Sequence, residues 1–181
     1  MQFEDLVPEG LKLVTPRVFP DDRGFFFESY HRPRYSEGGI EVEFVQDNHS
    51  HSTYGTIRGM HFQSGVGQAK LLRVANGRIF DVAVDIRPGS ATFGQWKGVY
   101  LDSETHQQLY VPVGFAHGFC VVSEEATVMY KVSSVYDGAT ETGFKWNDPD
   151  VGIEWPVDEP CISARDQTAQ SFADLRAELG A

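Results

Sequence analysis

The sequence predicts a single all-β domain, folded as a barrel or a two-sheet jelly roll, with a short helix at its C-terminal end. Short apolar or aromatic runs alternate with turns rich in Gly and Pro through most of the 181 residues. No strand-like run alternates with a long helical pattern, which argues against a parallel α/β sheet. Aromatic residues make up 13% of the chain, including thirteen Phe, and such residues favour strands.

The expected strands share an apolar or aromatic run that is closed by a turn. They cover residues 11–19, 24–30, 42–48, 56–62, 70–75, 78–86, 95–101, 108–111, 117–123 and 127–132. Residues 31–40 are mostly polar and contain two glycines, which indicates a short helix or a loop. Asn76 and Gly77 stand between two alternating runs, a pattern that predicts a β-hairpin.

Only the C-terminal end has a helical pattern. Phe172, Leu175 and Leu179 share one helical face, and Gly180 supplies a stop signal. We therefore expect one domain over residues 1–181, with a jelly-roll core over about residues 11–135 and a C-terminal segment over about residues 136–181.

The composition indicates a globular protein with an acidic surface. Hydrophobic residues make up 41% and charged residues 23%, and the formal net charge is -11. So acidic a chain is a poor candidate for binding nucleic acid or an anionic membrane, although converging Arg side chains can still bind phosphate locally. The acidic N-terminus has no apolar leader, and no apolar run approaches the roughly 18 residues that span a bilayer. We therefore expect a soluble cytoplasmic protein.

The sequence gives little support to a metal site. His49 and His51 form a His-x-His pair, but the next acidic residue is Asp81, too far along the chain to complete a local ligand set. Solvent-facing positions are the favoured interpretation of both histidines. The chain also lacks a P-loop, a Gly-x-Gly-x-x-Gly motif after a strand and a Gly-x-Ser-x-Gly motif, so phosphoryl transfer, nicotinamide chemistry and serine hydrolysis have no support.

Several polar side chains stand inside strand-like runs. Arg58 and His61 share one run, and Lys70, His117 and Tyr130 stand in three others. A single histidine or tyrosine in a strand is usually a packing or hydrogen-bonded residue. Because strands of a small barrel point alternate side chains inward, these residues could also converge on an interior ligand site.

A series of motifs carries a resemblance that extends from about residue 16 to residue 167. The motifs are DRGFFFESY (22–30), FVQDNHS (44–50), GTIRGMHFQ (55–63), QAKL (68–71), FDVAVDIR (80–87), GFAHGF (114–119), VMYK (128–131), WNDP (146–149), IEWP (153–156) and SARD (163–166), with Tyr136 and Glu141 between them. Each motif alone is a weak signal, but the full set, in this order and spacing, is specific. The chain resembles the dTDP-4-dehydrorhamnose 3,5-epimerase family.

The resemblance implies a cupin-like jelly roll, usually dimeric, that uses neither a metal nor an organic cofactor. It implies epimerisation at C3 and C5 of dTDP-4-dehydro-6-deoxy-D-glucose, which gives dTDP-4-dehydro-L-rhamnose for dTDP-L-rhamnose biosynthesis. The protons on C3 and C5 are acidic because their loss gives an enolate of the C4 ketone. This reaction needs a base, an acid on the opposite face of the sugar, and a positive charge near the ketone oxygen.

The family's functional residues match positions of this sequence. The resemblance implies that His61 is the base, Asp166 the carboxylate paired with it, Tyr130 the acid and Lys70 the cation near the ketone. The implied substrate contacts are Arg23, Glu28, Gln46, Asp47, Asn48, Arg58, Lys70, His117, Tyr136, Glu141 and Arg165. Tyr136 is the expected stacking partner of the thymine. In a homodimer, Arg23 and Glu28 would reach the site of the partner subunit.

Two departures from the family pattern are small. Met60 replaces the more common Leu, and Arg165 stands where Lys is frequent, which keeps the charge but changes the donor geometry. Two alternatives stay open at this point. One is an epimerase that inverts only C3 or only C5 of a related dTDP-keto-deoxysugar, and the other is a non-catalytic sugar-binding or metal-binding jelly roll.

Overall fold

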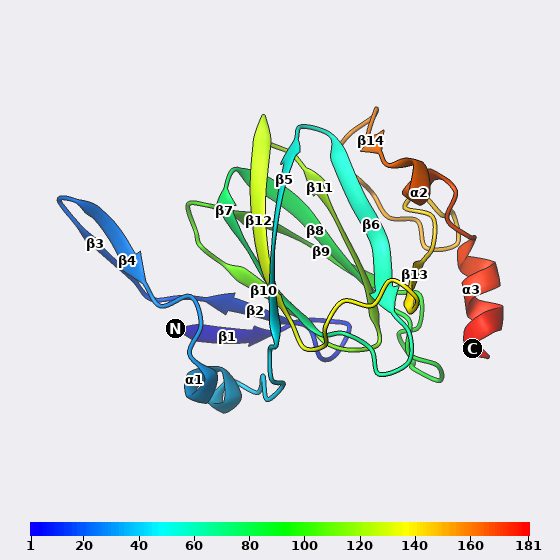
Figure 1. The fold of residues 1–181 in the computed structure, drawn as a ribbon, viewed down its shortest axis with the longest axis horizontal. Coiled ribbons are helices and arrows are strands. Elements are labelled where there is room, and N and C mark those ends of the chain that lie inside the picture. The colour runs from blue at the N-terminus through cyan, green and yellow to red at the C-terminus, as the bar shows by residue number, and fades with distance from the viewer.

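Two β-sheets lie face to face, and the chain crosses between them repeatedly (Figure 1). The structure is a computed structural model that describes residues 1–181. The first sheet has the order β1 (Gln2–Asp5), β2 (Lys12–Thr15), β10 (Gln108–Val111), β7 (Lys70–Asn76), β12 (Glu125–Val132) and β5 (Gln46–Thr53). The second has the order β13 (Glu141–Gly143), β6 (Thr56–Gln63), β11 (Phe115–Val121), β8 (Arg78–Asp85) and β9 (Trp96–Asp102). A short strand, β14 (Cys161–Ile162), runs parallel to β6.

Side chains from both sheets fill the space between them. Leu72 and Val74 of β7 point into this space, where they pack with Ile79 of β8 and Val121 of β11. Because side chains alternate along a strand, the neighbouring Leu71 faces the opposite side of the first sheet. Fully burying a large aliphatic side chain contributes roughly 1.5–3 kcal/mol, so this cluster is a main source of stability.

The C-terminal segment covers the outer face of the second sheet. Phe144, Phe172 and Leu175 pack there against Val82 and Val84 of β8, so every residue of β8 after Arg78 is buried. Helix α3 (Phe172–Leu179) begins at Ser171, whose hydroxyl accepts from the Asp174 backbone N–H, and ends at Gly180 with a positive φ of 68°. The predicted C-terminal helix is therefore confirmed, and the C-terminus lies at the edge of the molecule (Figure 1).

A two-stranded hairpin projects from the sandwich on the side opposite α3 (Figure 1). It consists of β3 (Val18–Asp21) and β4 (Gly24–Phe27), and it is followed by helix α1 (Arg32–Glu37). Phe25 and Phe26 are exposed on this hairpin. Exposed Phe side chains on a projecting element are typical of a surface that contacts a partner.

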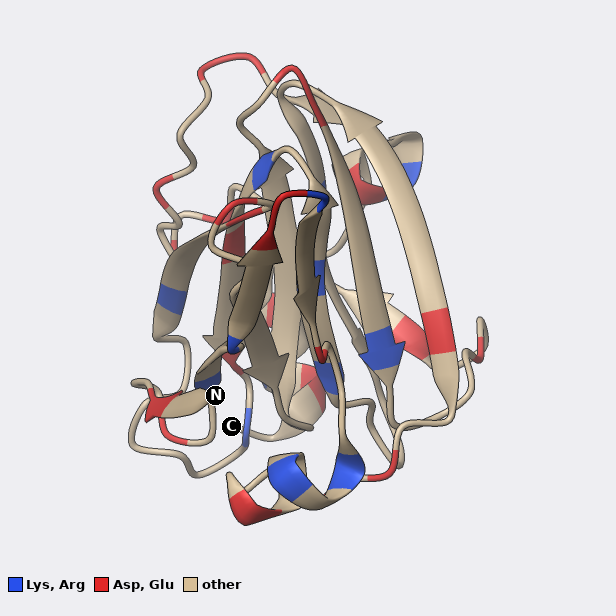
Figure 2. Ribbon diagram, turned by 90° about the vertical axis from the view of Figure 1, so that its left-hand side faces the viewer, with Lys and Arg blue, Asp and Glu red and all other residues tan.

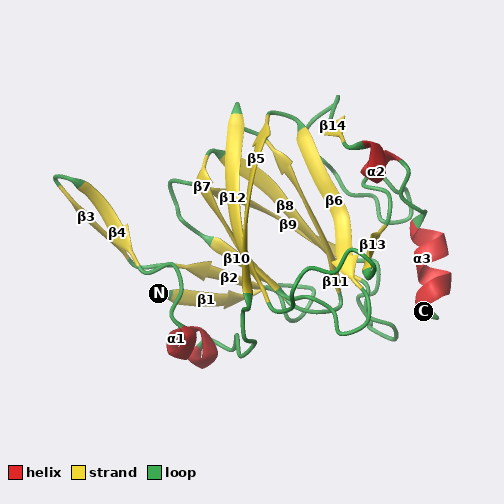
Figure 3. Ribbon diagram, viewed as in Figure 1, coloured by secondary structure: helices red, strands yellow, loops and turns green.

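Strands dominate the structure, and the only helices are α1, α2 (Ala164–Gln167) and α3 (Figure 3). The all-β jelly roll predicted from the sequence is confirmed.

None of the three helices is long and apolar enough to cross a membrane. Figure 2 shows Lys and Arg residues lying among Asp and Glu residues in that view rather than in one block.

The predicted hairpin at Asn76 and Gly77 is wrong. The two strands on either side of this turn, β7 and β8, belong to different sheets, so the turn carries the chain across the sandwich. Gly77 has a φ of 80°, and an added Cβ would meet the Glu125 carbonyl oxygen. Asn76 and Gly77 do form a tight turn. Which strands β7 and β8 pair with is decided instead by packing, because both strands are apolar along most of their length.

Two further boundaries differ from the prediction. The expected strand over residues 11–19 is broken at Pro16, since a proline has no N–H for the sheet, and its second half forms the hairpin strand β3. The expected strand over residues 42–48 starts only at Gln46 and continues to Thr53. Val42 and Phe44 instead pack against the cluster around Tyr35 without joining a sheet. The short elements β1, β13, β14 and α2 were not predicted.

Candidate active site

A cavity of about 770 Å³ opens between the two sheets. Strands β5, β7 and β12 supply one wall and β6 and β11 supply the other, while α2 and the segment before β13 lie at the rim. The lining includes these residues predicted from the sequence: Gln46, Asn48, Arg58, His61, Lys70, His117, Tyr130, Tyr136, Glu141, Arg165 and Asp166. Residues from both halves of the chain thus meet in one concave site, as a ligand site in a jelly roll requires.

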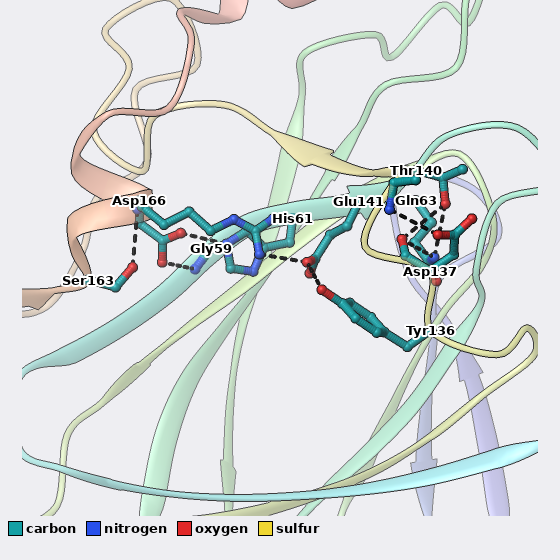
Figure 4. Close-up of polar contacts among 11 residues, drawn as sticks. Gly59, His61, Gln63, Tyr136, Asp137, Thr140, Glu141, Ser163 and Asp166 are labelled. Carbon is teal, nitrogen blue, oxygen red and sulfur yellow. Dashed lines mark hydrogen bonds and ion pairs between the residues drawn. The ribbon is translucent and has the colours of Figure 1, made fainter.

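His61 and Asp166 form a close pair in this cavity. The His61 Nε2 lies 2.6 Å from the Asp166 Oδ1, so the pairing that the resemblance implied is present (Figure 4). The Asp166 side chain is only 6% exposed, whereas that of His61 is 25% exposed to the cavity. Asp166 accepts one further hydrogen bond, from the Gly59 backbone N–H at 3.4 Å, and it is held on α2, whose N-cap is Ser163.

Asp166 is ionised despite its burial. Burial by itself raises the pKa of this carboxyl, but the hydrogen bond and charge of His61 and the Gly59 N–H outweigh burial and hold the pKa below its ordinary value. A carboxylate can only accept hydrogen bonds. When the imidazole is neutral, its proton therefore lies on the His61 Nε2, and Nδ1 has the free lone pair.

Lys70 enters the cavity from β7 with a strongly perturbed ammonium group. Removal from water lowers the pKa of Lys70 to about 8, while the nearby carboxylates of Glu141 and Asp81 act in the opposite direction. The side chain thus remains mainly a cation at neutral pH. A partly desolvated cation of this kind interacts strongly with a developing negative charge.

His117 lies on β11 directly opposite His61 of β6. Its Nε2 is 3.0 Å from both carboxylate oxygens of Asp81, which is fully buried on β8. Desolvation lowers the pKa of His117, and the charges of Lys70 and His61 lower it further. The carboxylate of Asp81 acts in the opposite direction. The ring is therefore fixed in orientation by a buried carboxylate, as His61 is by Asp166.

Tyr130 lines the cavity from β12, on the sheet opposite to that of His61. Desolvation raises the pKa of Tyr130, with the Arg58 charge acting against this and Glu141 adding to it. The phenol is therefore protonated at neutral pH. Arg58 is exposed on β6, and its Nε donates to the Ser52 Oγ at 3.0 Å, which leaves part of the guanidinium free for an anionic ligand.

Three predicted contact residues form a group at the rim. The Tyr136 hydroxyl donates to Glu141 Oε2 at 2.9 Å, and the Arg165 Nη1 donates to the same oxygen at 2.6 Å. Burial raises the pKa of Glu141, but the hydrogen bonds from Arg165 and Tyr136 outweigh it and lower the pKa overall. Figure 4 shows Tyr136 and Glu141 pointing toward each other from the segment that precedes and begins β13.

Three predicted contact residues lie away from the cavity of their own chain. Arg23 stands in the turn of the projecting hairpin, is 89% exposed and pairs with Asp21. Glu28 pairs with Arg34 of α1. Asp47 faces the outer side of β5, where both carboxylate oxygens accept from Lys131 at 2.8 and 3.1 Å.

The His49 and His51 side chains are exposed on the outer face of β5, as the favoured interpretation of the sequence states. His51 contacts Thr127 Oγ1 at 3.2 Å and lies 3.6 Å from Glu125. No group of three or more His, Cys, Asp or Glu side chains is placed to hold a metal ion.

The sequence did not predict Asp81 or Ser50 as residues of the site. Asp81, which orients His117, is an acidic residue inside the apolar run of β8, and this burial was a usable signal. Ser50 lines the cavity, and its Oγ is buried without a hydrogen-bond partner. Nothing in the sequence marks Ser50 except its place on the same strand face as Gln46 and Asn48.

The family model described as dTDP-4-dehydrorhamnose 3,5-epimerase matches residues 6–174. The chain belongs to this epimerase family. A dTDP-4-dehydrorhamnose 3,5-epimerase of Shigella flexneri is 49% identical over 170 residues, which cover 93% of each chain. A dTDP-4-dehydrorhamnose 3-epimerase of Streptomyces niveus is 42% identical over 178 residues, covering 97% of this chain and 86% of the relative.

A solved member of the epimerase family supports the same fold assignment. The crystal structure of the 3,5-epimerase of Legionella pneumophila, in complex with dTDP-4-keto-L-rhamnose, superimposes with a TM-score of 0.94 at 44% identity. The superposition covers 98% of this chain and 96% of that one. The jelly roll of this chain is thus the fold of that epimerase.

Proposed function

We propose that this chain catalyses the epimerisation of dTDP-4-dehydro-6-deoxy-D-glucose at C3 and C5, giving dTDP-4-dehydro-L-rhamnose for dTDP-L-rhamnose biosynthesis. The observation that carries the proposal is the His61–Asp166 pair on one wall of a cavity whose other wall presents Lys70 and Tyr130. Inversion at a carbon next to a ketone requires proton removal on one face and proton delivery on the other. Membership of the epimerase family supports this reading.

The proton steps follow from the state of each group. The His61 Nδ1 takes the proton from C3 or C5, and the Asp166 carboxylate stabilises the imidazolium that forms. The Lys70 ammonium, a cation at neutral pH with its pKa of about 8, stabilises the enolate oxygen at C4. Tyr130, whose pKa is raised by burial, delivers a proton to the opposite face. These steps use only side-chain groups.

The nucleotide part of the substrate fits the cationic residues of the cavity. Arg58 provides a planar donor for the diphosphate, and Tyr136 at the rim provides an aromatic face for the thymine. The cations of the cavity and its rim explain how a chain with a net charge of -11 holds an anionic ligand. Gln46, Asn48, His117, Glu141 and Arg165 are the proposed polar contacts of the substrate.

We also propose that the working form is a homodimer in which Arg23 and Glu28 reach the site of the partner subunit. The projecting hairpin, the exposed Phe25 and Phe26, and the position of Arg23 away from its own cavity support this arrangement. Asp47, on the outer side of β5, is also proposed as a substrate contact, and only the family resemblance supports it. A cytoplasmic location is proposed as well, as predicted from the sequence.

Incubation with dTDP-4-dehydro-6-deoxy-D-glucose in heavy water, followed by proton NMR, tests the proposal. We expect deuterium at both C3 and C5 and the L-rhamno configuration in the product. In His61→Ala we expect exchange at both carbons to fall by about a hundredfold or more, the range for loss of a general base. Exchange at wild-type rates in this variant would overturn the assignment of the base.

The same spectra separate the proposal from its rivals. Deuterium at C3 alone would place the activity with the 3-epimerase of Streptomyces niveus, to which the chain is 42% identical. Binding of the sugar nucleotide without exchange at either carbon would indicate a non-catalytic jelly roll.

A further inference from the structure

The segment over residues 133–140, here called the rim loop, connects β12 with β13 and carries Tyr136 at the cavity rim. The loop belongs to no sheet, and the Tyr136 side chain is 54% exposed. Apolar packing therefore does little to hold Tyr136 in place. The position of this aromatic ring must depend on the hydrogen bonds that fix the loop backbone.

Gln63, at the end of β6, is the central polar side chain beneath the rim loop (Figure 4). Gln63 is only 9% exposed. The Gln63 Nε2 donates to the Asp137 carbonyl oxygen and to the Thr140 Oγ1, both at 3.2 Å. Its Oε1 accepts from the Gln68 Nε2, and Gln68 also donates to the Ser134 carbonyl oxygen at 3.0 Å.

The two glutamines thus hold the rim loop at both ends. Gln68 binds the loop next to β12, and Gln63 binds it next to β13. A third glutamine, Gln46 of β5, accepts from the Tyr136 backbone N–H at 3.0 Å. The Ser64 backbone N–H also holds the loop, because it donates to the Thr140 carbonyl oxygen at 2.9 Å.

We propose that Gln63 is a positioning residue for nucleotide recognition, which acts through Tyr136 by fixing the rim loop. The inference rests on the proposed function, because it takes Tyr136 to contact the nucleobase. An amide suits this role, since its NH2 group donates to the loop carbonyl while its oxygen accepts from the Gln68 amide. Because this nearly buried side chain spends its hydrogen bonds on the loop and on Gln68, its effect is to hold the loop in place.

The test compares wild type with Gln63→Leu, which has a similar volume but no hydrogen-bonding group. Hydrogen–deuterium exchange of the 133–140 peptide should become faster in Gln63→Leu, without any ligand present. The Kd for dTDP, measured by calorimetry, and the KM for the sugar nucleotide should rise by about tenfold, the scale set by losing a buried hydrogen-bond partner. Because no reacting atom is touched, kcat should stay within about twofold.

Two controls make the test specific. Gln107→Leu removes a side-chain hydrogen bond to Thr15 far from the cavity and should leave loop exchange, Kd and KM unchanged. In a Tyr136→Ala background, Gln63→Leu should cause little further loss of dTDP affinity, because the residue through which it acts is gone. Gln63→Glu keeps the size and the acceptor but loses the donor, and repulsion between its carboxylate and the Asp137 carbonyl oxygen should release the loop at least as much as Gln63→Leu does.

Unchanged exchange of the rim loop in both Gln63 variants would overturn the inference while leaving the proposed function intact. Losses of affinity that simply add in the Tyr136→Ala background, or a fall in kcat as large as the rise in KM, would overturn it too. Failure of the wild-type protein to bind dTDP would instead count against the proposed function, and the inference would fall with it.

Discussion

Desolvation has opposite effects on two residues that line the same wall of the cavity. It lowers the pKa of Lys70 to about 8 and raises the pKa of Tyr130 above its ordinary value. Lys70 is therefore a cation at neutral pH with a pKa not far above it, and Tyr130 is a protonated acid. This pairing matches what enolate chemistry needs beside a ketone, namely a positive charge at the oxygen and a proton donor at the carbon.

Removing the Tyr130 hydroxyl should separate proton removal from inversion. In Tyr130→Phe, His61 can still take a proton and return a deuteron to the same face, so exchange into recovered substrate should persist. Formation of the inverted product should fall by about a hundredfold, the effect of losing a general acid. NMR of substrate and product in heavy water measures both rates. Equal loss of exchange and inversion would contradict the donor role.

The depressed pKa of Lys70 predicts an alkaline limit on activity. As the pH rises through about 8, the Lys70 ammonium loses its proton and its charge, so kcat/KM should fall. Lys70→Arg should be less active, yet its kcat/KM should show no fall in this range because a guanidinium stays charged. Tyr130 does not interfere, since burial raises its pKa above its ordinary value.

The pH profile of kcat/KM, recorded from about pH 6 to about pH 10, checks this expectation. Lys97→Arg makes the same substitution on β9, outside the cavity, and should keep the wild-type profile. An alkaline fall that persists unchanged in Lys70→Arg would assign it to another group.

At the scale of elements, the β3–β4 hairpin makes the dimer testable. If Arg23 serves the partner's site, a chain with Arg23→Ala and a chain with His61→Ala have complementary defects. In their heterodimer, the site with an intact His61 also receives an intact Arg23. After exchange of subunits, the mixture should recover about a quarter of wild-type activity, since half of the dimers carry one complete site.

Activity of the mixture that equals the mean of the two separate variants would show that Arg23 acts within its own chain. A mixture of His61→Ala with Asp166→Asn is the matched control. Both residues line the same cavity, so every site of that heterodimer contains one defect and no activity should return.

The sequence predicts strands well where apolar residues dominate and poorly where they do not. The runs that became β7, β8, β11 and β12 were all expected, because their core residues leave a clear pattern. Strand β5 was misplaced, since Gln46, Asn48 and Ser50 face a cavity instead of a core. The pairing of β7 with β10 and β12 could not be read from the turn at Asn76, because pairing depends on long-range packing.

The residue types of the candidate site and the pairing of His61 with Asp166 were predictable, but the other supporting contacts were not. Resemblance to the family supplied His61, Lys70 and Tyr130, and the structure places them around one cavity. The carboxylate beneath His117 and the glutamine beneath the rim loop were not predicted. Their contacts join residues 36 and 74 positions apart, and such tertiary contacts leave no periodic trace in one sequence.

At the scale of the whole molecule, one buried acid should limit stability. Asp85 is fully buried at the end of β8 and accepts from the Arg87 backbone and side chain, from Ser90 Oγ at 2.7 Å and from Thr92 Oγ1 at 2.6 Å. Burial raises the pKa of Asp85, but these hydrogen bonds outweigh it and hold the pKa far below its ordinary value.

Asp85→Asn should lower the free energy of unfolding by about 3 kcal/mol at neutral pH, because it leaves the Arg87 guanidinium without its charge partner. The depressed pKa sets the sign of the pH effect. The stability from Asp85 is present above the unfolded pKa of about 3.9 and is lost as the pH falls toward the folded value. In urea unfolding, the gap between wild type and variant should therefore shrink below about pH 4.

Asp5→Asn provides the matched control, since Asp5 is exposed and pairs with Lys12 at the surface. Its effect on the free energy of unfolding should stay within about 0.5 kcal/mol at every pH tested. A gap for Asp85→Asn that does not change with pH would mean that the carboxylate's charge is not the source of its contribution.

Leu72, Val128 and Phe119 pack together between the two sheets, and the same residues border the cavity. A sugar bound there would occupy the space that side chains fill elsewhere between the sheets, so the ligand would take the place of part of the core. Each sheet then touches only one face of the ring. The configuration at the reacting carbons would then depend on the distance between the two sheets.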